Sequence, residues 1–212
     1  LPTHTGTKNI VIQQNKVIAE LEFRSKVVGV KLRRERIVVA LENVVYTYNF
    51  ADLQMLHEIK TCPNPTGLCA MSSRDLVVVA SPAEAPGHVT ITKSLPDAGA
   101  TTTTAEVLDI NAHNGPISCI ALSMDGKFLA TASNKGTLVR VWDTNTGSRL
   151  KEVRRGADNA EIHSINFNSD ASLLCVSSNK GTCHVFSLGS LSNGTAASPP
   201  PAQHQDAHRQ HS

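Results

Sequence analysis

The sequence predicts an all-β fold, because it repeats a strand-rich unit and lacks helical periodicity. Residues 111–143 and 157–188 carry the same pattern at an offset of 45 residues. Ser133 matches Ser178, and the Asn-Lys-Gly-Thr segment at 134–137 matches the one at 179–182. A repeat of about 40–45 residues that ends in a Trp-Asp pair is typical of the four-stranded blades of a WD40-type β-propeller. No long stretch shows an apolar period of 3.6 residues, so we expect few helices.

Composition narrows the class of protein. Of the 212 residues, 40% are apolar, which is enough for a folded core. The net charge is only +2, so the overall electrostatic field gives no indication of nucleic-acid binding. Any anion site must therefore arise from a local cluster of charges. The five cysteines show no C-x-x-C spacing, which argues against a zinc site or a disulfide framework and favours a reducing compartment. We see no apolar run of membrane-spanning length and no signal peptide.

Ahead of the two clear repeats, short β-rich runs alternate with polar turns, which is the pattern of antiparallel strands. In chain order we expect these strands at residues 10–12, 17–23, 27–32, 37–41, 44–50, 56–61, 68–71, 76–80 and 88–92. Residues 51–58 also have helical propensity, so a helix and a link to the next strand both stay open there. Within the first repeat we expect strands at 117–122, 128–132 and 137–142, separated by turns at 124–126 and 134–136.

The same pattern predicts the organisation of the chain. Residues 1–8 are expected to be a linker or a truncated end, 9–188 a partial propeller, and 189–212, rich in Ala, Pro, Ser, Gln and His, a disordered tail. We place the blades at 9–23 (incomplete), 24–62, 63–110, 111–152 and 153–188. Residues 95–104, rich in Thr, Ala, Pro and Gly, are expected to be a flexible surface insert.

Two adjacent arginines, Arg154 and Arg155, follow the first repeat. Successive side chains of a strand point to opposite faces, so these two cannot both serve one small site. The fork of donors on a guanidinium matches a phosphate. Taken alone, the pair is most simply a solvated charged strand. Its place between two matched repeats, with hydroxyl residues at equivalent positions, favours instead a seam shared by two phosphate pockets.

With these repeats and the arginine pair, the chain resembles a known family. The segments ASNKGTLVRVWDT, EVRRGAD and INFNSDASLLCVSSNKGTCHVF are similar to the PROPPINs, called WIPI proteins in animals, which are phosphoinositide-binding WD-repeat propellers of autophagy. Upstream segments such as LEFRSKVVGVKLRRERIVVALENVVYTYNF and NPTGLCAMS resemble earlier blades, closest to plant and algal members. The most specific element is the family's F/L-R-R-G motif, present here as Val153-Arg154-Arg155-Gly156.

The resemblance implies a seven-bladed propeller, of which this chain holds about four blades, with two headgroup sites on either side of the Arg-Arg strand. The implied ligands are phosphatidylinositol 3-phosphate and phosphatidylinositol 3,5-bisphosphate. By motif position, the first site would use Arg154, His113, Ser133, Thr137 and Arg140, and the second Arg155, Ser177, Ser178, Thr182 and His184. A purely structural role also stays open for these residues: His113 can hydrogen-bond within its blade, and the serines and threonines can be ordinary strand residues.

Two departures from the family bear on these sites. An open arc of blades is expected to expose apolar blade faces. The chain also leaves the pattern after Leu188, so we expect the second site to be incomplete and membrane insertion by the family's apolar loop to be in doubt.

The first repeat has one extra residue between its Gly-Thr pair and its aromatic residue, which suggests a bulge that re-aims Arg140.

The function implied is a cytosolic, peripheral membrane effector of autophagosome formation. It would be recruited to the phagophore assembly site and to endosomal or vacuolar membranes. Its expected partners are phosphoinositide-containing membranes, an autophagy lipid-transfer protein and the conjugation machinery. A lipid-independent WD-repeat scaffold and a non-functional truncated form remain alternatives. No nucleophile elbow, P-loop or metalloprotease motif is present, so an enzyme, a cofactor and a metal are not expected.

Overall fold

The computed structural model describes residues 8–9, 19–74, 76–94 and 105–191. Every regular element in these residues is a β-strand, which confirms the all-β prediction. They contain no helix of the length and hydropathy needed to cross a membrane. The expected strand at 10–12, the insert at 95–104 and almost all of the predicted linker and tail lie outside the described residues.

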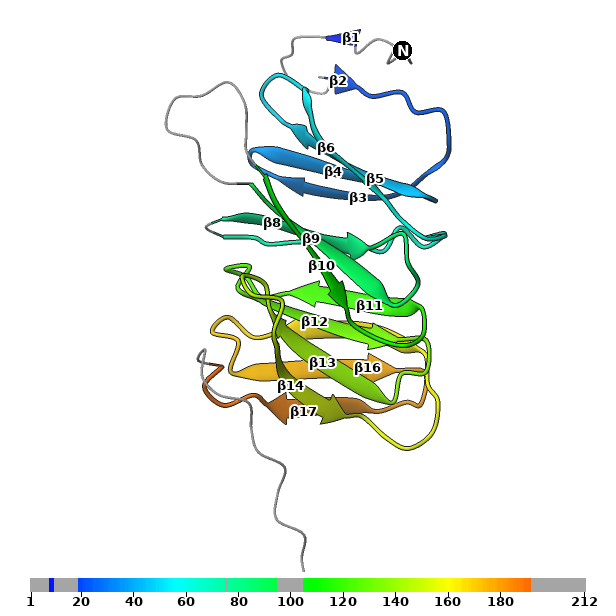
Figure 1. The fold of residues 1–212 in the computed structure, drawn as a ribbon, viewed down its shortest axis with the longest axis vertical. Helices are drawn as coiled ribbons and strands as arrows, with labels where there is room; N and C mark the ends of the chain where they lie inside the picture. Colours follow the sequence, from blue (N-terminus) through cyan, green and yellow to red (C-terminus); the bar gives the residue numbers. More distant parts are fainter. Residues whose placement is uncertain (1–7, 10–18, 75, 95–104, 192–212) are drawn as a thin grey trace, which may run out of the picture.

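Four antiparallel sheets follow one another along the chain and stack in sequence order (Figure 1). Sheet I contains β3 (Val27–Arg33), β4 (Arg36–Leu41), β5 (Val44–Asn49) and β6 (Met55–Lys60). Sheet II contains β7 (Ala70–Met71), β8 (Val77–Pro82), β9 (His88–Ser94) and β10 (Ala105–Asn111). Sheet III contains β11 (Ile117–Leu122), β12 (Phe128–Ser133), β13 (Leu138–Asp143) and β14 (Arg149–Arg154).

Sheet IV has three strands: β15 (Ile162–Phe167), β16 (Leu173–Ser178) and β17 (Cys183–Ser187). A separate pair, β1 (Lys8–Asn9) and β2 (Ala19–Glu20), lies beyond sheet I (Figure 1). Within each large sheet, strands that are consecutive in the chain are hydrogen-bonded neighbours. This is the up-and-down order of propeller blades.

Apolar side chains fill each gap between sheets. Val38 and Val79 belong to the cluster between sheets I and II, Leu129 and Trp142 to the cluster between II and III, and Leu174 to the cluster between III and IV. The cause is strand alternation, because a blade with neighbours on both sides must be apolar on both faces. Apolar side chains stay exposed on both end faces of the stack: Leu32 on sheet I is 67% exposed and Val185 on sheet IV is 63% exposed.

Glycine turns bring consecutive sheets into close approach. Gly136 has a φ of +61°, and a Cβ there would lie 1.8 Å from the carbonyl oxygen of Ala160. Gly181 holds the same place in the next repeat, with a φ of +68°, but a Cβ there would meet nothing within 4 Å. The first turn therefore needs glycine for backbone conformation and for space, and the second only for conformation.

The structure departs from the sequence predictions, or decides between them, at β6, at β10 and in the register of β13. Residues 55–60 are the strand β6, so the helical alternative is wrong there. The strand β10 went unpredicted, because its polar outer edge lacks a continuous apolar run. The extra residue of the first repeat does not bulge β13 against β12: Arg140 pairs with Thr131, and His184 pairs with Val176, the counterpart of Thr131. The turn before β13 absorbs the extra residue, so Arg140 and His184 hold equivalent places.

Candidate functional site

The paired arginines lie at the end of β14, the outer strand of sheet III, and differ sharply in exposure. Along β14, exposed Glu152 and Arg154 flank buried Val153, whose side chain packs between sheets III and IV. Arg154 therefore shares the opposite face, toward sheet II, while Arg155 is 8% exposed at the junction with sheet IV. This geometry is what strand alternation requires of two residues that serve separate sites.

The face of sheet III toward sheet II carries the residues predicted for the first site. Ser133 is two residues beyond Thr131 on β12, and Leu138 pairs with Arg154, so the hydroxyl and the guanidinium lie near the same end of the sheet. Arg140 is partly engaged within the protein, because its Nε donates to Glu152 Oε2 at 2.8 Å and its Nη1 to the Ala112 carbonyl at 2.7 Å. An incoming anion would have to compete with a carboxylate for this arginine.

His113 occupies a buried position below this face. Its Nε2 lies 3.0 Å from Thr131 Oγ1, which also accepts a 2.9 Å hydrogen bond from the Trp142 indole. Burial, with the nearby Arg140 charge, lowers the pKa of His113 to about 4. A neutral imidazole at this depth anchors the connection between β10 and β11 to β12. It carries no positive charge for an anion near pH 7.

Arg155 holds the turn between β12 and β13 to the connection between β14 and β15 through backbone carbonyls. Its Nε donates to Gly136 O at 2.7 Å and its Nη2 donates to Asp158 O, while its backbone N–H donates to Thr137 O at 2.9 Å. A guanidinium has five N–H donors, so these two side-chain contacts leave others for an anion. The half-buried Thr137 thus supplies a carbonyl acceptor at what we call the arginine seam, the end of β14 that carries Arg154 and Arg155.

Sheet IV places its candidate residues on two different faces. Ser178 and His184 share the face of buried Val176, toward sheet III and Arg155. Thr182 lies in the turn between β16 and β17, two residues before His184 on β17. The Thr182 Oγ1 and His184 Nε2 atoms lie 3.1 Å apart. Ser177 pairs with Cys183 on the opposite face, so the structure does not bring Ser177 together with the other four residues of the second site.

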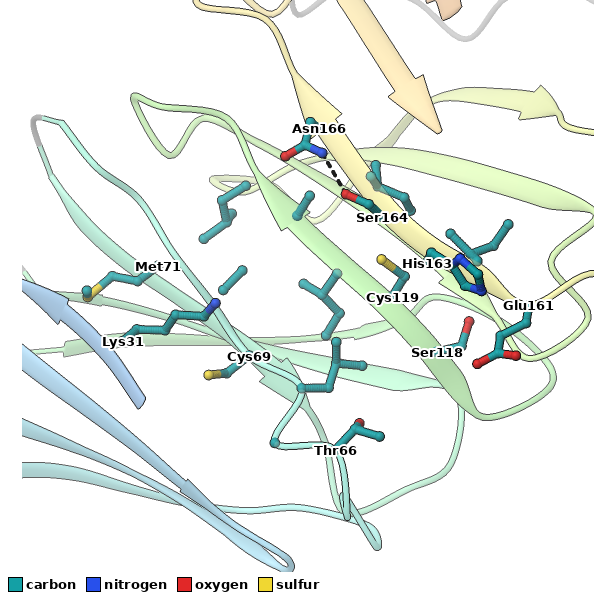
Figure 2. Close-up of a pocket in the computed structure, with 18 residues that line it drawn as sticks. Lys31, Thr66, Cys69, Met71, Ser118, Cys119, Glu161, His163, Ser164 and Asn166 are labelled. Carbon is teal, nitrogen blue, oxygen red and sulfur yellow. Dashed lines mark hydrogen bonds between the residues drawn. The ribbon is translucent and has the colours of Figure 1, made fainter. Parts of the chain in front are cut away.

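A wide cavity of about 740 Å³ lies elsewhere, along the inner strands of the sheets. Figure 2 shows residues around it that include Met71 of β7, Cys119 of β11 and His163 of β15, with Cys69 just before β7. None of the ten predicted headgroup residues lines this cavity. It is the concave inner side of the arc, separate from the arginine seam. In the described residues no cluster of three or more His, Cys, Asp or Glu side chains could hold a metal ion.

Sequence reasoning missed two features of the seam. Glu152 accepts a hydrogen bond from Arg140 and a second one from Arg149 Nη1 at 3.1 Å. Its position two residues before Arg154 on one strand was a usable signal, since such residues share a face. The carbonyls of Gly136 and Asp158 that hold Arg155 carried no sequence signal, because any residue supplies a carbonyl.

Comparison with known proteins identifies the family of this chain. The family model described as PROPPIN matches residues 3–203. The chain belongs to the PROPPIN family. Autophagy-related protein 18 of Aspergillus terreus is 38% identical over 204 residues, covering 88% of this chain and 49% of the relative. The same-named protein of Mycosarcoma maydis is 39% identical over 193 residues, covering 84% of this chain and 43% of that protein.

Solved PROPPIN structures match the four sheets. Kluyveromyces lactis Hsv2 superposes with a TM-score of 0.70 at 29% identity, covering 84% of this chain and 53% of that one. A complex of KlAtg21 with the coiled-coil of AgAtg16 matches with a TM-score of 0.61 at 26% identity, covering 80% of this chain and 54% of that one. This PROPPIN chain therefore spans about half the length of the relatives it matches, and its fold is the propeller predicted from the repeats.

Proposed function

We propose that this PROPPIN chain binds phosphatidylinositol 3-phosphate and phosphatidylinositol 3,5-bisphosphate and acts as a peripheral effector in autophagosome formation, not as an enzyme. The main support is the placement of Arg154 and Arg155 on opposite sides of one strand end, with Ser133 and Ser178 at the same position of the two repeats, each paired with the first residue of its sheet's first strand. The first pocket is centred on Arg154, the exposed member of the pair. The names of the relatives, autophagy-related proteins, support the cellular role.

The chemistry of the seam supports anion binding at the two pockets to different degrees. A phosphate monoester is bound well by one guanidinium and several hydroxyl or backbone donors. The Arg154 pocket offers an exposed guanidinium with Ser133 and Thr137 close to the same sheet end. The Arg155 pocket offers a guanidinium already held by two carbonyls, with Ser178, Thr182 and His184 on the face of sheet IV that turns toward sheet III. We therefore assign the stronger binding to the Arg154 pocket.

Membrane recruitment is proposed to bring autophagy machinery to the phagophore assembly site and to endosomal or vacuolar membranes. The partners would be a lipid-transfer protein and the conjugation machinery. KlAtg21, a structural neighbour, has been solved with an Atg16 coiled-coil, which supports a partner of this kind. A lipid-independent scaffold would bind such partners without the arginine seam.

Liposome sedimentation tests the proposal. The double variant Arg154→Thr/Arg155→Thr is expected to lose binding to phosphatidylcholine liposomes that carry phosphatidylinositol 3-phosphate. Arg154→Thr alone should weaken binding strongly without destabilising the fold, because Arg154 is exposed. Rising salt should weaken wild-type binding, since the contacts are charge-based and near the surface.

A matched control separates the seam from general basicity. The variant Arg24→Thr/Arg34→Thr removes two exposed arginines outside sheets III and IV and should sediment as wild type does. Circular dichroism of each variant checks that it is folded. Equal sedimentation of wild type and the folded seam variant would refute the lipid sites, and a wild-type chain that ignores these liposomes would favour the scaffold.

A further inference from the structure

The outer face of sheet IV carries two cysteines in contact. Cys175 lies on β16 and Cys183 on β17, and their sulfur atoms are 3.1 Å apart. The strand register explains the contact, because Cys175 pairs with Val185 and Cys183 pairs with Ser177, which makes the cysteines diagonal neighbours on one face. The two thiols are therefore held together by the sheet itself.

This thiol pair differs from the other cysteines in access. Cys183 is exposed and Cys175 is half-buried, whereas Cys69 and Cys119 are buried. Burial raises the pKa of both Cys69 and Cys119, which keeps them as unreactive thiols. The hydrogen bond with Cys183 raises the pKa of Cys175. Cys183 is thus the sulfur that a dissolved oxidant can reach, with Cys175 next to it.

We propose that Cys175 and Cys183 form a redox-active dithiol that hydrogen peroxide converts to an intramolecular disulfide. The Cys183 thiolate attacks one peroxide oxygen, the O–O bond breaks, and Cys183 becomes a sulfenic acid as hydroxide leaves and is protonated to water. The Cys175 sulfur then attacks the Cys183 sulfur, the S–O bond breaks, and a second water leaves. Two thiols and one peroxide give one disulfide and two waters, and a dithiol reductant reverses the change.

The surrounding structure permits this bond. The sulfurs must approach from 3.1 Å to about 2.05 Å. β17 is the last strand of sheet IV and pairs only with β16 in the described residues, so it can shift toward its neighbour. The bond would close the turn that carries Ser178 and Thr182, which lies next to the seam side of sheet IV.

Mass spectrometry of the full 212-residue chain tests the proposal. After hydrogen peroxide treatment at low protein concentration, the intact mass should fall by about 2 Da, the loss of two hydrogens, and dithiothreitol should restore it. Trypsin cleaves after Lys180, between the two cysteines. The oxidised chain should therefore yield residues 156–180 joined to residues 181–209, and this species should vanish on reduction.

Two variants and a probe complete the test. Cys183→Ser should abolish the mass loss, while Cys62→Ser, which removes another cysteine that is not buried, should retain it. Phenylarsine oxide, which bridges two adjacent thiols, should protect Cys175 and Cys183 of the untreated wild-type chain from iodoacetamide. An unchanged wild-type mass, a disulfide mapped to another pair, or a disulfide between two chains in place of the joined peptides would overturn the proposal.

Discussion

Replacing Arg155 by methionine should destabilise the fold, although the residue is charged and belongs to a proposed binding site. The variant removes the hydrogen bonds from Nε to Gly136 O and from Nη2 to Asp158 O. Hydrogen bonds from a charged group contribute about 1.5–3 kcal/mol each, and methionine keeps part of the side-chain packing. The loss of both bonds should therefore lower the free energy of unfolding by about 3–6 kcal/mol. Arg154→Met is the matched control, and at an exposed position it should change stability by no more than about 0.5 kcal/mol.

Urea denaturation followed by the fluorescence of Trp142 measures this difference. Trp142 is the only tryptophan and is 7% exposed between sheets II and III, so its emission should shift as the sheets separate. Both variants should show the same dependence of unfolding free energy on urea, with a lower midpoint for Arg155→Met. Equal midpoints for the two variants would refute the view that Arg155 stabilises the junction of sheets III and IV.

Three further predictions concern neighbouring positions. Gly136→Ala should prevent stable folding because its Cβ would overlap a carbonyl, whereas Gly181→Ala should cost only about 1 kcal/mol of backbone strain. Urea titration should show no cooperative transition for the first variant and a slightly lowered midpoint for the second. His113 has a folded pKa near 4 against 6.5 for the free side chain, so the unfolded chain binds more protons between these values, and stability should fall by roughly 3 kcal/mol as pH drops from about 6.5 to 4. Its replacement by glutamine should flatten that pH dependence in parallel urea titrations. Glu152→Gln should strengthen liposome binding about two- to fivefold by releasing Arg140, and unchanged sedimentation would exclude Arg140 from the headgroup site.

The repeat made the fold largely predictable. The match of Ser133 with Ser178 and the Trp142-Asp143 signature are enough to indicate blades, because each blade solves the same packing problem with the same turns. The strand β10 escaped prediction because an outer blade strand faces solvent and loses the apolar pattern. The helix or strand choice at residues 51–58 needed the pairing of β6 with β5, which is a contact between strands that local propensity does not encode.

The candidate site was predictable in outline but not in its contacts. Alternation alone placed Arg154 and Arg155 on opposite sides, but which of the two is buried depends on how the sheets pack. Their environments did not follow, because Arg155 is held by carbonyls of a turn and of a connecting segment that the fold brings next to it. His113 shows the same limit, since its neutral state depends on burial beneath Arg140 and on a hydroxyl of the adjacent sheet. Ser177 lay one residue from Ser178, and only the register showed that it faces away.

By itself, the sequence determined the blade repeat, the family and the placement of two arginines on two faces, because each of these is a local pattern of spacing. Only the tertiary structure decided which charges are available. Glu152 reaches Arg140 and two carbonyls reach Arg155 through contacts between neighbouring strands and sheets. The contact between Cys175 and Cys183 likewise arises from strand register. Contacts of this kind depend on how sheets pack, and no spacing along the chain encodes them.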